Sequence, residues 1–151
     1  MDQHDVLAQA IANHPALSTH GFVGDPGGAL SAWTAIARMD APSVAKPSSL
    51  AELADSWTLV CRTLRLLDPS GEVLLSLGGY GGLPWLYTSC ASASALLSVR
   101  APRYSDIEIV IVDPSIERLA AITTEEDHYL VFAGRKAKDN DWQLSPMLSA
   151  F

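Results

Sequence analysis

The chain lacks the features that mark secreted and membrane-spanning proteins. It has two cysteines in 151 residues, and both stand among apolar or small residues. We therefore expect Cys61 and Cys90 to be buried free thiols, not a disulfide pair. No apolar run approaches the roughly 20 residues that cross a bilayer. The acidic start, Met1-Asp2-Gln3-His4-Asp5, is not followed by an apolar stretch, so the sequence predicts a cytoplasmic protein without a membrane partner.

Positive charge is also scarce. Ten Lys and Arg residues stand against 17 Asp and Glu residues, which gives a net charge of −7. Because binding to a phosphate backbone depends on clustered Lys and Arg, we expect no nucleic-acid partner. The basic residues are unevenly spread, however. The middle of the chain is locally basic, since it contains Arg62, Arg65, Arg100 and Arg103 against only Asp68 and Glu72.

Motifs that carry known chemistry are missing as well. The four histidines do not have metal-ligand spacing, and there is no Cys-x-x-Cys pair. No Gly-Lys-Ser/Thr follows the glycine-rich loop, and no Gly-x-Ser-x-Gly turn is present. We therefore expect no metal and no cofactor, and we lean against an enzyme. One pairing stays open, because folding could bring Cys90 beside His128.

Apolar residues make up 48% of the chain, which is enough for one packed core. Prolines in the segment 40–47 suggest a seam within that unit. We predict an N-terminal helical extension over residues 1–47, with helices at 2–13 and from Asp25 to about Met39. An α/β sandwich domain follows over residues 48–151.

The predicted sandwich domain begins with a helix, because Ser49 and Glu52 form a capping box. Residues 58–67 keep helical spacing but are rich in Thr, Val and Leu. A strand is favoured there, and a continued helix is the alternative. A turn at Asp68-Pro69-Ser70-Gly71 leads to a strand at 72–77 and a glycine loop at 78–82.

Small residues and a proline near the start favour a helix over residues 83–98. The nearly all-apolar segment 107–112 is typical of a central strand. A hairpin of strands 117–123 and 128–133 follows it. The predicted fold class is α+β with two layers: a roughly five-stranded antiparallel sheet, one helix packed on one face, and the N-terminal helical extension.

This order of elements resembles the roadblock/LC7 domain. The resemblance covers residues 48–133 and rests on Leu66-Leu67-Asp68-Pro69-Ser70-Gly71-Glu72-Val73-Leu74, on the small-residue helix, and on the strands from Ile107 to Phe132. Members of that family are homodimeric or heterodimeric scaffolds and regulators of small GTPases and motors. The resemblance implies a protein partner and a homodimer.

Two groups of residues are candidates for binding. The glycine loop before the predicted helix can present backbone N–H groups to an anion, through Gly79, Gly81 and Gly82. The interaction candidates are the loop and helix aromatics, the small face of the helix, and the three acids of the hairpin tip, namely Tyr80, Trp85, Tyr87, Ala93, Leu97, Glu125, Glu126 and Asp127.

The sequence therefore favours a non-catalytic protein-interaction and regulatory module that forms a homodimer. The first alternative is a small acidic immunity protein or a chaperone for a secreted effector, which the charge and the single small domain suggest. The second alternative is a small ligand-binding domain or enzyme that uses the Gly78–Gly82 loop.

Overall fold

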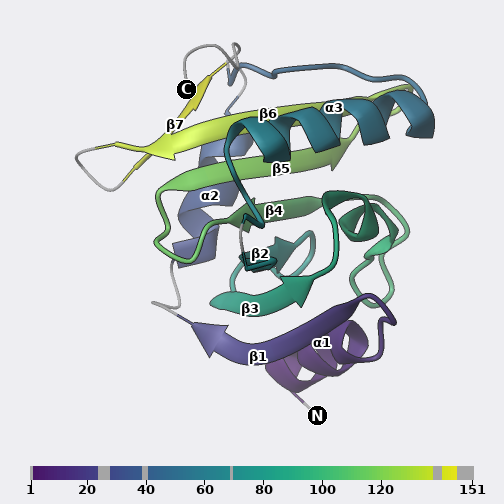
Figure 1. Cartoon of the computed structure of the whole chain (residues 1–151), viewed down its shortest axis with the longest axis vertical. Coiled ribbons are helices and arrows are strands. Elements are labelled where there is room, and N and C mark those ends of the chain that lie inside the picture. Colours follow the sequence, from purple (N-terminus) through teal and green to yellow (C-terminus); the bar gives the residue numbers. More distant parts are fainter. Residues whose placement is uncertain (1, 24–27, 39–40, 69, 138–140, 146–151) are drawn as a thin grey trace.

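Seven antiparallel strands form a single sheet in the computed structural model, which describes residues 2–23, 28–38, 41–68, 70–137 and 141–145 (Figure 1). The strands lie in the order β1-β3-β2-β4-β5-β6-β7. Their bounds are β1 Leu17–Val23, β2 Glu72–Leu77, β3 Trp85–Cys90, β4 Ile109–Val112, β5 Arg118–Thr124, β6 Tyr129–Lys136 and β7 Trp142–Ser145.

Helices cover both faces of this sheet. In Figure 1, α3 crosses in front of β5 and β6, and α2 lies behind the sheet. The helical elements are α1 Gln3–Ala12, α2 Gly28–Ile36, α3 Leu50–Thr63 and the short 3₁₀ helix η1 Ala93–Ser98. Within the described residues, no helix combines the length and the apolar character needed to cross a membrane.

The central strand β4 shows why two helical layers are present. Its four residues, Ile109 to Val112, are all fully buried and apolar. Successive side chains of a strand point to opposite faces, so both faces of β4 need an apolar cover. Ile109 and Ile111 belong to one core cluster, and Val110 and Val112 belong to another.

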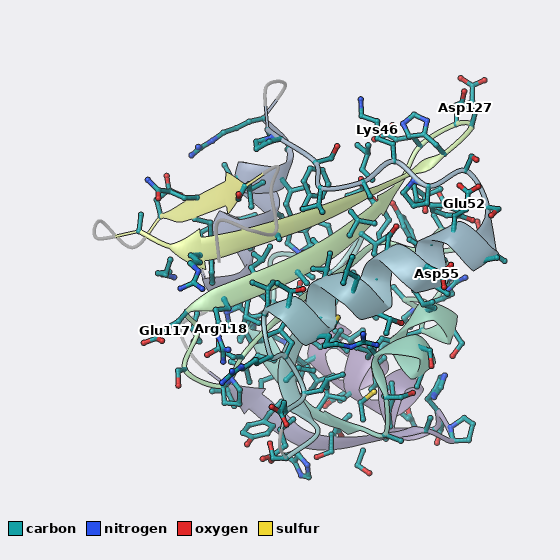
Figure 2. The ribbon with its side chains drawn as sticks, turned by 45° about the horizontal axis from the view of Figure 1, so that its top comes forward. Lys46, Glu52, Asp55, Glu117, Arg118 and Asp127 are labelled. Carbon is teal, nitrogen blue, oxygen red and sulfur yellow. The ribbon has the colours of Figure 1, made fainter. Side chains whose placement is uncertain are left out.

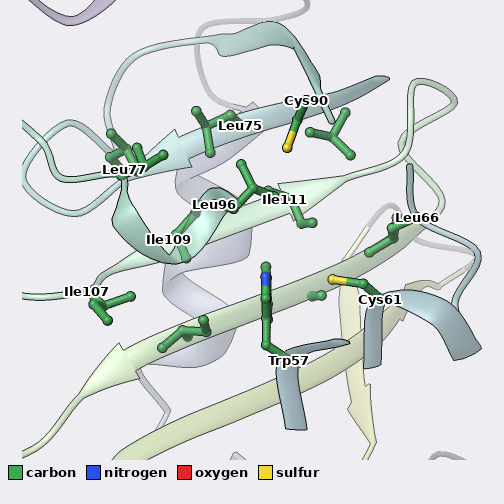
Figure 3. Close-up of a cluster of buried hydrophobic side chains, with 14 of the residues drawn as sticks. Trp57, Cys61, Leu66, Leu75, Leu77, Cys90, Leu96, Ile107, Ile109 and Ile111 are labelled. Atoms are coloured by element: carbon green, nitrogen blue, oxygen red, sulfur yellow. The ribbon is translucent and has the colours of Figure 1, made fainter. Parts of the chain in front are cut away.

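The first cluster fills the space between the sheet and α1, α3 and η1. Trp57 lies at its centre and is fully buried (Figure 3). Its indole N–H donates to the carbonyl oxygen of Ala93 over 3.0 Å, which ties α3 to η1. Both thiols, Cys61 and Cys90, are free and buried here, as the sequence predicts.

The second cluster lies under α2. Small residues of α2 (Ala29, Ala32 and Ala35) bring its backbone close to the sheet, where all three are buried. Trp33 of α2 donates its indole N–H to the hydroxyl of Ser76 over 2.8 Å. This bond satisfies one of the few buried polar side chains of the sheet.

The prediction of a five-stranded sheet with one covered face is wrong. The sheet has seven strands, and both faces carry helices. Three of its strands are not predicted by the sequence. Two of them form the edges of the sheet, β1 beside β3 and β7 beside β6, and the third is the inner strand β3 itself. Because β1 belongs to segment 1–47, the N-terminal region is part of the main sheet and shares its core through Leu17.

The prediction of a strand over residues 58–67 is also wrong. The favoured strand is helix up to Thr63, and residues 64–67 continue as turn. Leu53, Trp57, Val60 and Cys61 repeat at helical spacing and are all buried. Burial of that apolar stripe outweighs the β propensity of individual residues, which is a weak determinant by itself. The N-cap at Ser49 is confirmed, because its hydroxyl accepts from the N–H of Glu52 over 3.2 Å. The Glu52 carboxylate accepts in return from the N–H of Ser48 over 3.0 Å, one residue before the position that a capping box predicts.

The predicted helix over residues 83–98 is not formed. Residues 85–90 are strand β3, and only Ala93–Ser98 are helical, as one short 3₁₀ element. Trp85, Tyr87 and Thr88 have high β propensity, and β3 has a hydrogen-bonded neighbour on each side. The small-residue helix, one of the elements on which the roadblock/LC7 resemblance rests, is therefore replaced by a strand and a short 3₁₀ helix.

Other predicted elements are confirmed: the first helix, the strand at 72–77 and the hairpin after β4. The predicted start of the second helix at Asp25 and Pro26 lies outside the described residues. The predicted strand at 107–112 is shorter, since β4 begins at Ile109.

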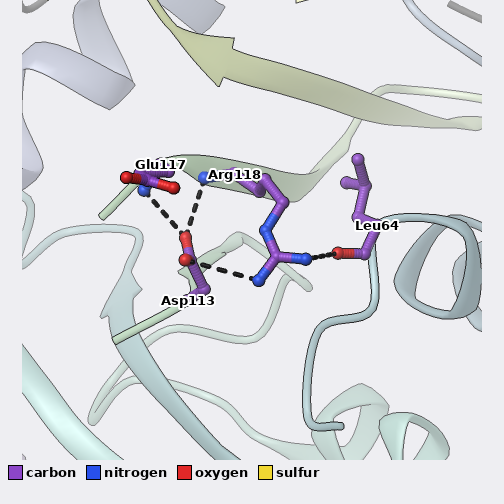
Figure 4. Close-up of polar contacts among 4 residues, drawn as sticks. All are labelled: Leu64, Asp113, Glu117 and Arg118. Atoms are coloured by element: carbon purple, nitrogen blue, oxygen red, sulfur yellow. Dashed lines mark hydrogen bonds and ion pairs between the residues drawn. The ribbon is translucent and has the colours of Figure 1, made fainter. Parts of the chain in front are cut away.

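A carboxylate network fixes the turn between β4 and β5 (Figure 4). Asp113 is 5% exposed, and its Oδ1 accepts from the backbone N–H groups of Glu117 and Arg118, each at 2.8 Å. Its other oxygen contacts the Arg118 guanidinium at 3.4 Å. That guanidinium also donates to the carbonyl oxygen of Leu64 over 2.5 Å. One carboxylate thereby joins the turn to the end of α3.

We predict that Asp113→Ala lowers the free energy of unfolding by about 2 kcal/mol or more, because it leaves two N–H groups without their acceptor and removes the carboxylate paired with the half-buried Arg118 guanidinium. Asp55→Ala, on the exposed side of α3, is the matched control and should change stability by less than about 0.5 kcal/mol. Urea denaturation measures both. Equal midpoints for the two variants would contradict the role of the network.

Candidate functional site

A cavity of about 410 Å³ lies between α2 and the sheet. We call it the α2 cavity. This volume lies within the range of small-ligand and side-chain pockets, roughly 300–1,000 Å³. Its walls come from α2, the segment after it, and strands β5 and β6, and they include Trp33, Ile36, Ala37, Arg38, Ala41, Glu108, Thr123, Thr124, Glu125, Leu130 and Phe132.

A second cavity of about 360 Å³ adjoins it toward β7 and shares Arg38 and Ala41 with it. Trp142 is in its wall and is 1% exposed. Among the described residues, the indole N–H of Trp142 has no acceptor. The two cavities therefore adjoin each other at these residues, and we call the pair the groove along the C-terminal end of α2.

Glu108 is the half-buried acid of the α2 cavity. It lies between the buried residues Ile107 and Ile109, at the entrance to β4. Its carboxylate accepts from the backbone N–H of Thr124 over 2.6 Å, and the Thr124 hydroxyl donates to the carbonyl oxygen of Ile107 over 2.8 Å. These two bonds fix Glu108 at the rim of the cavity.

The surroundings of Glu108 disfavour its negative charge. Burial raises the pKa of the Glu108 carboxyl, and nearby Asp106 and Glu125 raise it further. The N–H of Thr124 and the Tyr104 phenol act in the opposite direction and lower this pKa. A cation that entered the cavity would relieve the cost of ionising Glu108.

Arg38 is the cation among the described residues of the cavity wall, and its charge is already matched. Its guanidinium pairs with the Asp141 carboxylate at 2.9 Å. The same hydrogen bond lowers the pKa of Asp141. Glu108 and Glu125 therefore dominate the charge of the α2 cavity, above an apolar floor of Trp33, Ile36, Leu130 and Phe132.

The three acids of the hairpin tip are exposed, as expected for a binding candidate. Only Glu125 lies in the wall of the α2 cavity. Asp127 accepts from the ring of His128 over 2.5 Å, which lowers the pKa of Asp127. Figure 2 shows Asp127 at the far end of the β5–β6 hairpin from Glu117. The tip thus extends the acidic rim beyond the cavity.

The aromatic and small-residue candidates do not gather into one patch. Trp85 is fully buried under α2, and Tyr87 is half-buried, with its hydroxyl 2.7 Å from the Glu72 carboxylate. The other three pack against the first core cluster from the loop and from η1, namely Tyr80, Ala93 and Leu97.

The glycine loop joins two strands of a hairpin, β2 and β3. It therefore does not precede a helix, whose N-terminus was the basis for expecting an anion at Gly79, Gly81 and Gly82. Gly79 has a φ of +85°, which glycine adopts without strain. Gly81 lies against the Trp33 ring, so its role here is close packing under α2.

The open pairing of Cys90 with His128 is not realised. Three strands separate β3 from β6 in the sheet order. The Cys90 thiol donates to the carbonyl oxygen of Ser92 over 2.8 Å. No group of three or more His, Cys, Asp or Glu side chains in the described part of the chain has a metal-binding arrangement.

Sequence reasoning missed Trp33, Arg38 and Glu108. Glu108 carried a usable signal, since it is a lone acid within the apolar run Ile107-Glu108-Ile109-Val110. A charge at such a position needs a special environment. The positions of Trp33 and Arg38 opposite it depend on how α2 crosses the sheet, which the sequence pattern does not give.

Comparisons with protein-family models, curated proteins and solved structures found no match to this chain.

We predict that Gly81→Ala disturbs the α2 cavity. A Cβ atom at residue 81 would lie 2.6 Å from Cδ1 of Trp33, so α2 or its indole has to shift. We expect a loss of about 1–3 kcal/mol in stability and a changed Trp33 indole signal by NMR. Gly82→Ala is the matched control, because nothing lies within 4 Å of its added Cβ atom. If both variants kept the wild-type spectrum, the close contact would be disproved.

We predict that Glu108→Gln stabilises the protein at neutral pH. Because folding raises the pKa of Glu108 above its ordinary 4.5, the ionised carboxylate opposes folding at a pH above the raised pKa. The advantage of the variant should shrink as the pH falls toward 4.5 and vanish below it, where both folded and unfolded carboxyls are protonated. Denaturation of both proteins across this range measures the difference. A difference that does not change with pH would contradict the prediction, and Glu117→Gln controls for the loss of one exposed carboxylate.

Proposed function

We propose that this protein is a non-catalytic protein-interaction module that binds an extended segment of its partner in the groove along the C-terminal end of α2. In this proposal, a Lys or Arg side chain of the partner enters the α2 cavity and pairs with Glu108. The observation that carries the proposal is Glu108 itself, a half-buried acid without a cationic partner in its described surroundings, at the rim of a 410 Å³ cavity.

The shape and the chemistry of the α2 cavity support a basic side chain as the occupant. Its floor is apolar and its rim carries Glu108 and Glu125, which suits an alkyl stem ending in a cation. Pairing with Glu108 would form a charge-assisted hydrogen bond in a partly desolvated site, where such bonds are strong.

The adjoining cavity supports an extended segment over a free small cation. The groove continues past Arg38 and Ala41 to Trp142, whose indole N–H has no acceptor in the described part of the chain. An extended peptide brings backbone carbonyl groups, which are acceptors for such a donor.

The charge of the whole protein supports the same kind of partner. A net charge of −7 attracts a basic protein over a distance and speeds encounter. The exposed acids of the hairpin tip, Glu126 and Asp127, extend the acidic surface next to the groove. A small acidic immunity protein or an effector chaperone is a special case of this proposal, because each would bind one particular protein.

An array of nine-residue peptides tests the proposal. The peptides carry a central Arg, Lys, Gln or Glu between apolar residues, and fluorescence anisotropy measures their binding. Arg and Lys peptides should bind, and hexylguanidinium should displace them. Glu108→Gln should weaken binding about tenfold or more, because it removes the charged acceptor. Glu117→Gln, at the opposite end of β5, should leave the affinity unchanged.

Two results would contradict the proposal. Equal binding of the Gln peptides would show that Glu108 does not select a cation. Binding of hexylguanidinium together with no detectable binding of any of the peptides would indicate a small-ligand site, which is the second alternative that the sequence left open.

A further inference from the structure

A third cavity lies on the other face of the sheet, beside the C-terminal end of α3. It measures about 270 Å³, and its walls include Arg62, Arg65, Thr58 and Ser92 together with the apolar Leu66 and Ala93. We call it the arginine cavity. It belongs to the side of the first core cluster, so α2 and the groove described above do not contribute to it.

No described residue forms an ion pair with the arginines of this cavity. Arg62 and Arg65 are both exposed, and neither takes part in an ion pair with another described residue. The single acid in the walls is Asp68. The net charge of the lining is therefore +1, on a chain whose net charge is −7.

Stabilisation of the helix terminus does not account for both arginines. A cation in the last turn of a helix interacts favourably with the helix dipole, and this suffices for Arg62. Arg65 lies beyond the helix, in a left-handed conformation with φ of 55°, and Leu67 has φ of 72°. Residues other than glycine are uncommon in the left-handed region of φ, so these two residues indicate a strained backbone.

Several contacts hold this strained segment in place. Leu66 is 4% exposed, and its N–H donates to the carbonyl oxygen of Cys61 over 2.9 Å. The carbonyl oxygen of Leu64 accepts from the Arg118 guanidinium. The backbone position of Arg65 is therefore fixed beside Arg62, and little conformational freedom of the backbone would be lost when a ligand binds.

We propose that the arginine cavity binds a small phosphate monoester. Guanidinium groups donate pairs of parallel hydrogen bonds to phosphate oxygens, and two of them match a group that carries nearly two negative charges. The hydroxyls of Thr58 and Ser92 are further donors in the walls, and Leu66 and Ala93 provide an apolar surface for the ester group.

A titration with phenyl phosphate, followed by ¹⁵N NMR of the full chain, tests this assignment. We expect saturable shifts confined to the backbone of residues 58–68 and 92–93 and to the arginine side-chain N–H signals. Arg62→Gln and Arg65→Gln should each weaken binding about tenfold, as expected for the loss of a charged donor. Arg103→Gln is the matched control. It removes a basic charge from the same part of the chain but outside the cavity walls, and should leave the affinity unchanged.

Parallel titrations with inorganic phosphate and benzoate separate the contributions of the ligand. Phenyl phosphate should bind more tightly than either, because it combines the dianion with the apolar group. The proposal is overturned if no shift saturates, if Arg103→Gln weakens binding as much as Arg62→Gln, or if benzoate binds as tightly as phenyl phosphate. Thermal unfolding shows whether the variants are folded. If a variant does not fold, the titrations of the wild-type protein with the three ligands still test the proposal.

Discussion

The structure depends on the burial of both faces of strand β4. Four consecutive apolar residues, Ile109 to Val112, expose nothing to solvent. A strand of this kind is stable only with a hydrogen-bonded neighbour on each side and an apolar layer on each face. Strands β2 and β5 are the hydrogen-bonded neighbours, and α3 and α2 are the main helices of the two apolar layers. The remaining strands extend the sheet outward from this centre.

The carboxylates at the two ends of β4 are also divided between the two faces of the sheet. Where β4 begins, Glu108 faces the cavity under α2, and where β4 ends, Asp113 ties the next turn to α3 through Arg118. Asp113 is paired with a cation, and Glu108 is paired with none among the described residues. This contrast is the reason that Glu108, and not Asp113, is proposed as the partner-binding group.

The sequence predicted local elements well where one strong signal was present. The helix start with its N-cap at Ser49 and the apolar segment that contains β4 are examples. It failed for residues 58–63 and 85–90, where local propensity and tertiary burial favour different structures. In the first segment, a helical apolar stripe packs against the sheet in spite of β-forming residues. In the second, pairing on both sides makes a strand from residues that a small-residue pattern assigned to a helix.

The candidate sites were harder to predict than the fold, because their residues come from separate elements. Glu108, Trp33 and Arg38 meet only because α2 crosses one face of the sheet, and Arg62 approaches Ser92 only because η1 packs against α3 on the other. The amino-acid sequence shows which residues are charged, but it does not show which residues lie next to them in the folded chain. The locally basic middle of the chain was visible in the sequence, yet only the folded chain shows which of its arginines, Arg62 and Arg65, line a cavity and lack an anionic partner among the described residues. The acidic groove and the basic cavity lie on opposite faces of the sheet. Both depend on the burial of β4, because a sheet that is covered on both faces has two helical layers, and each layer has its own solvent-exposed edge.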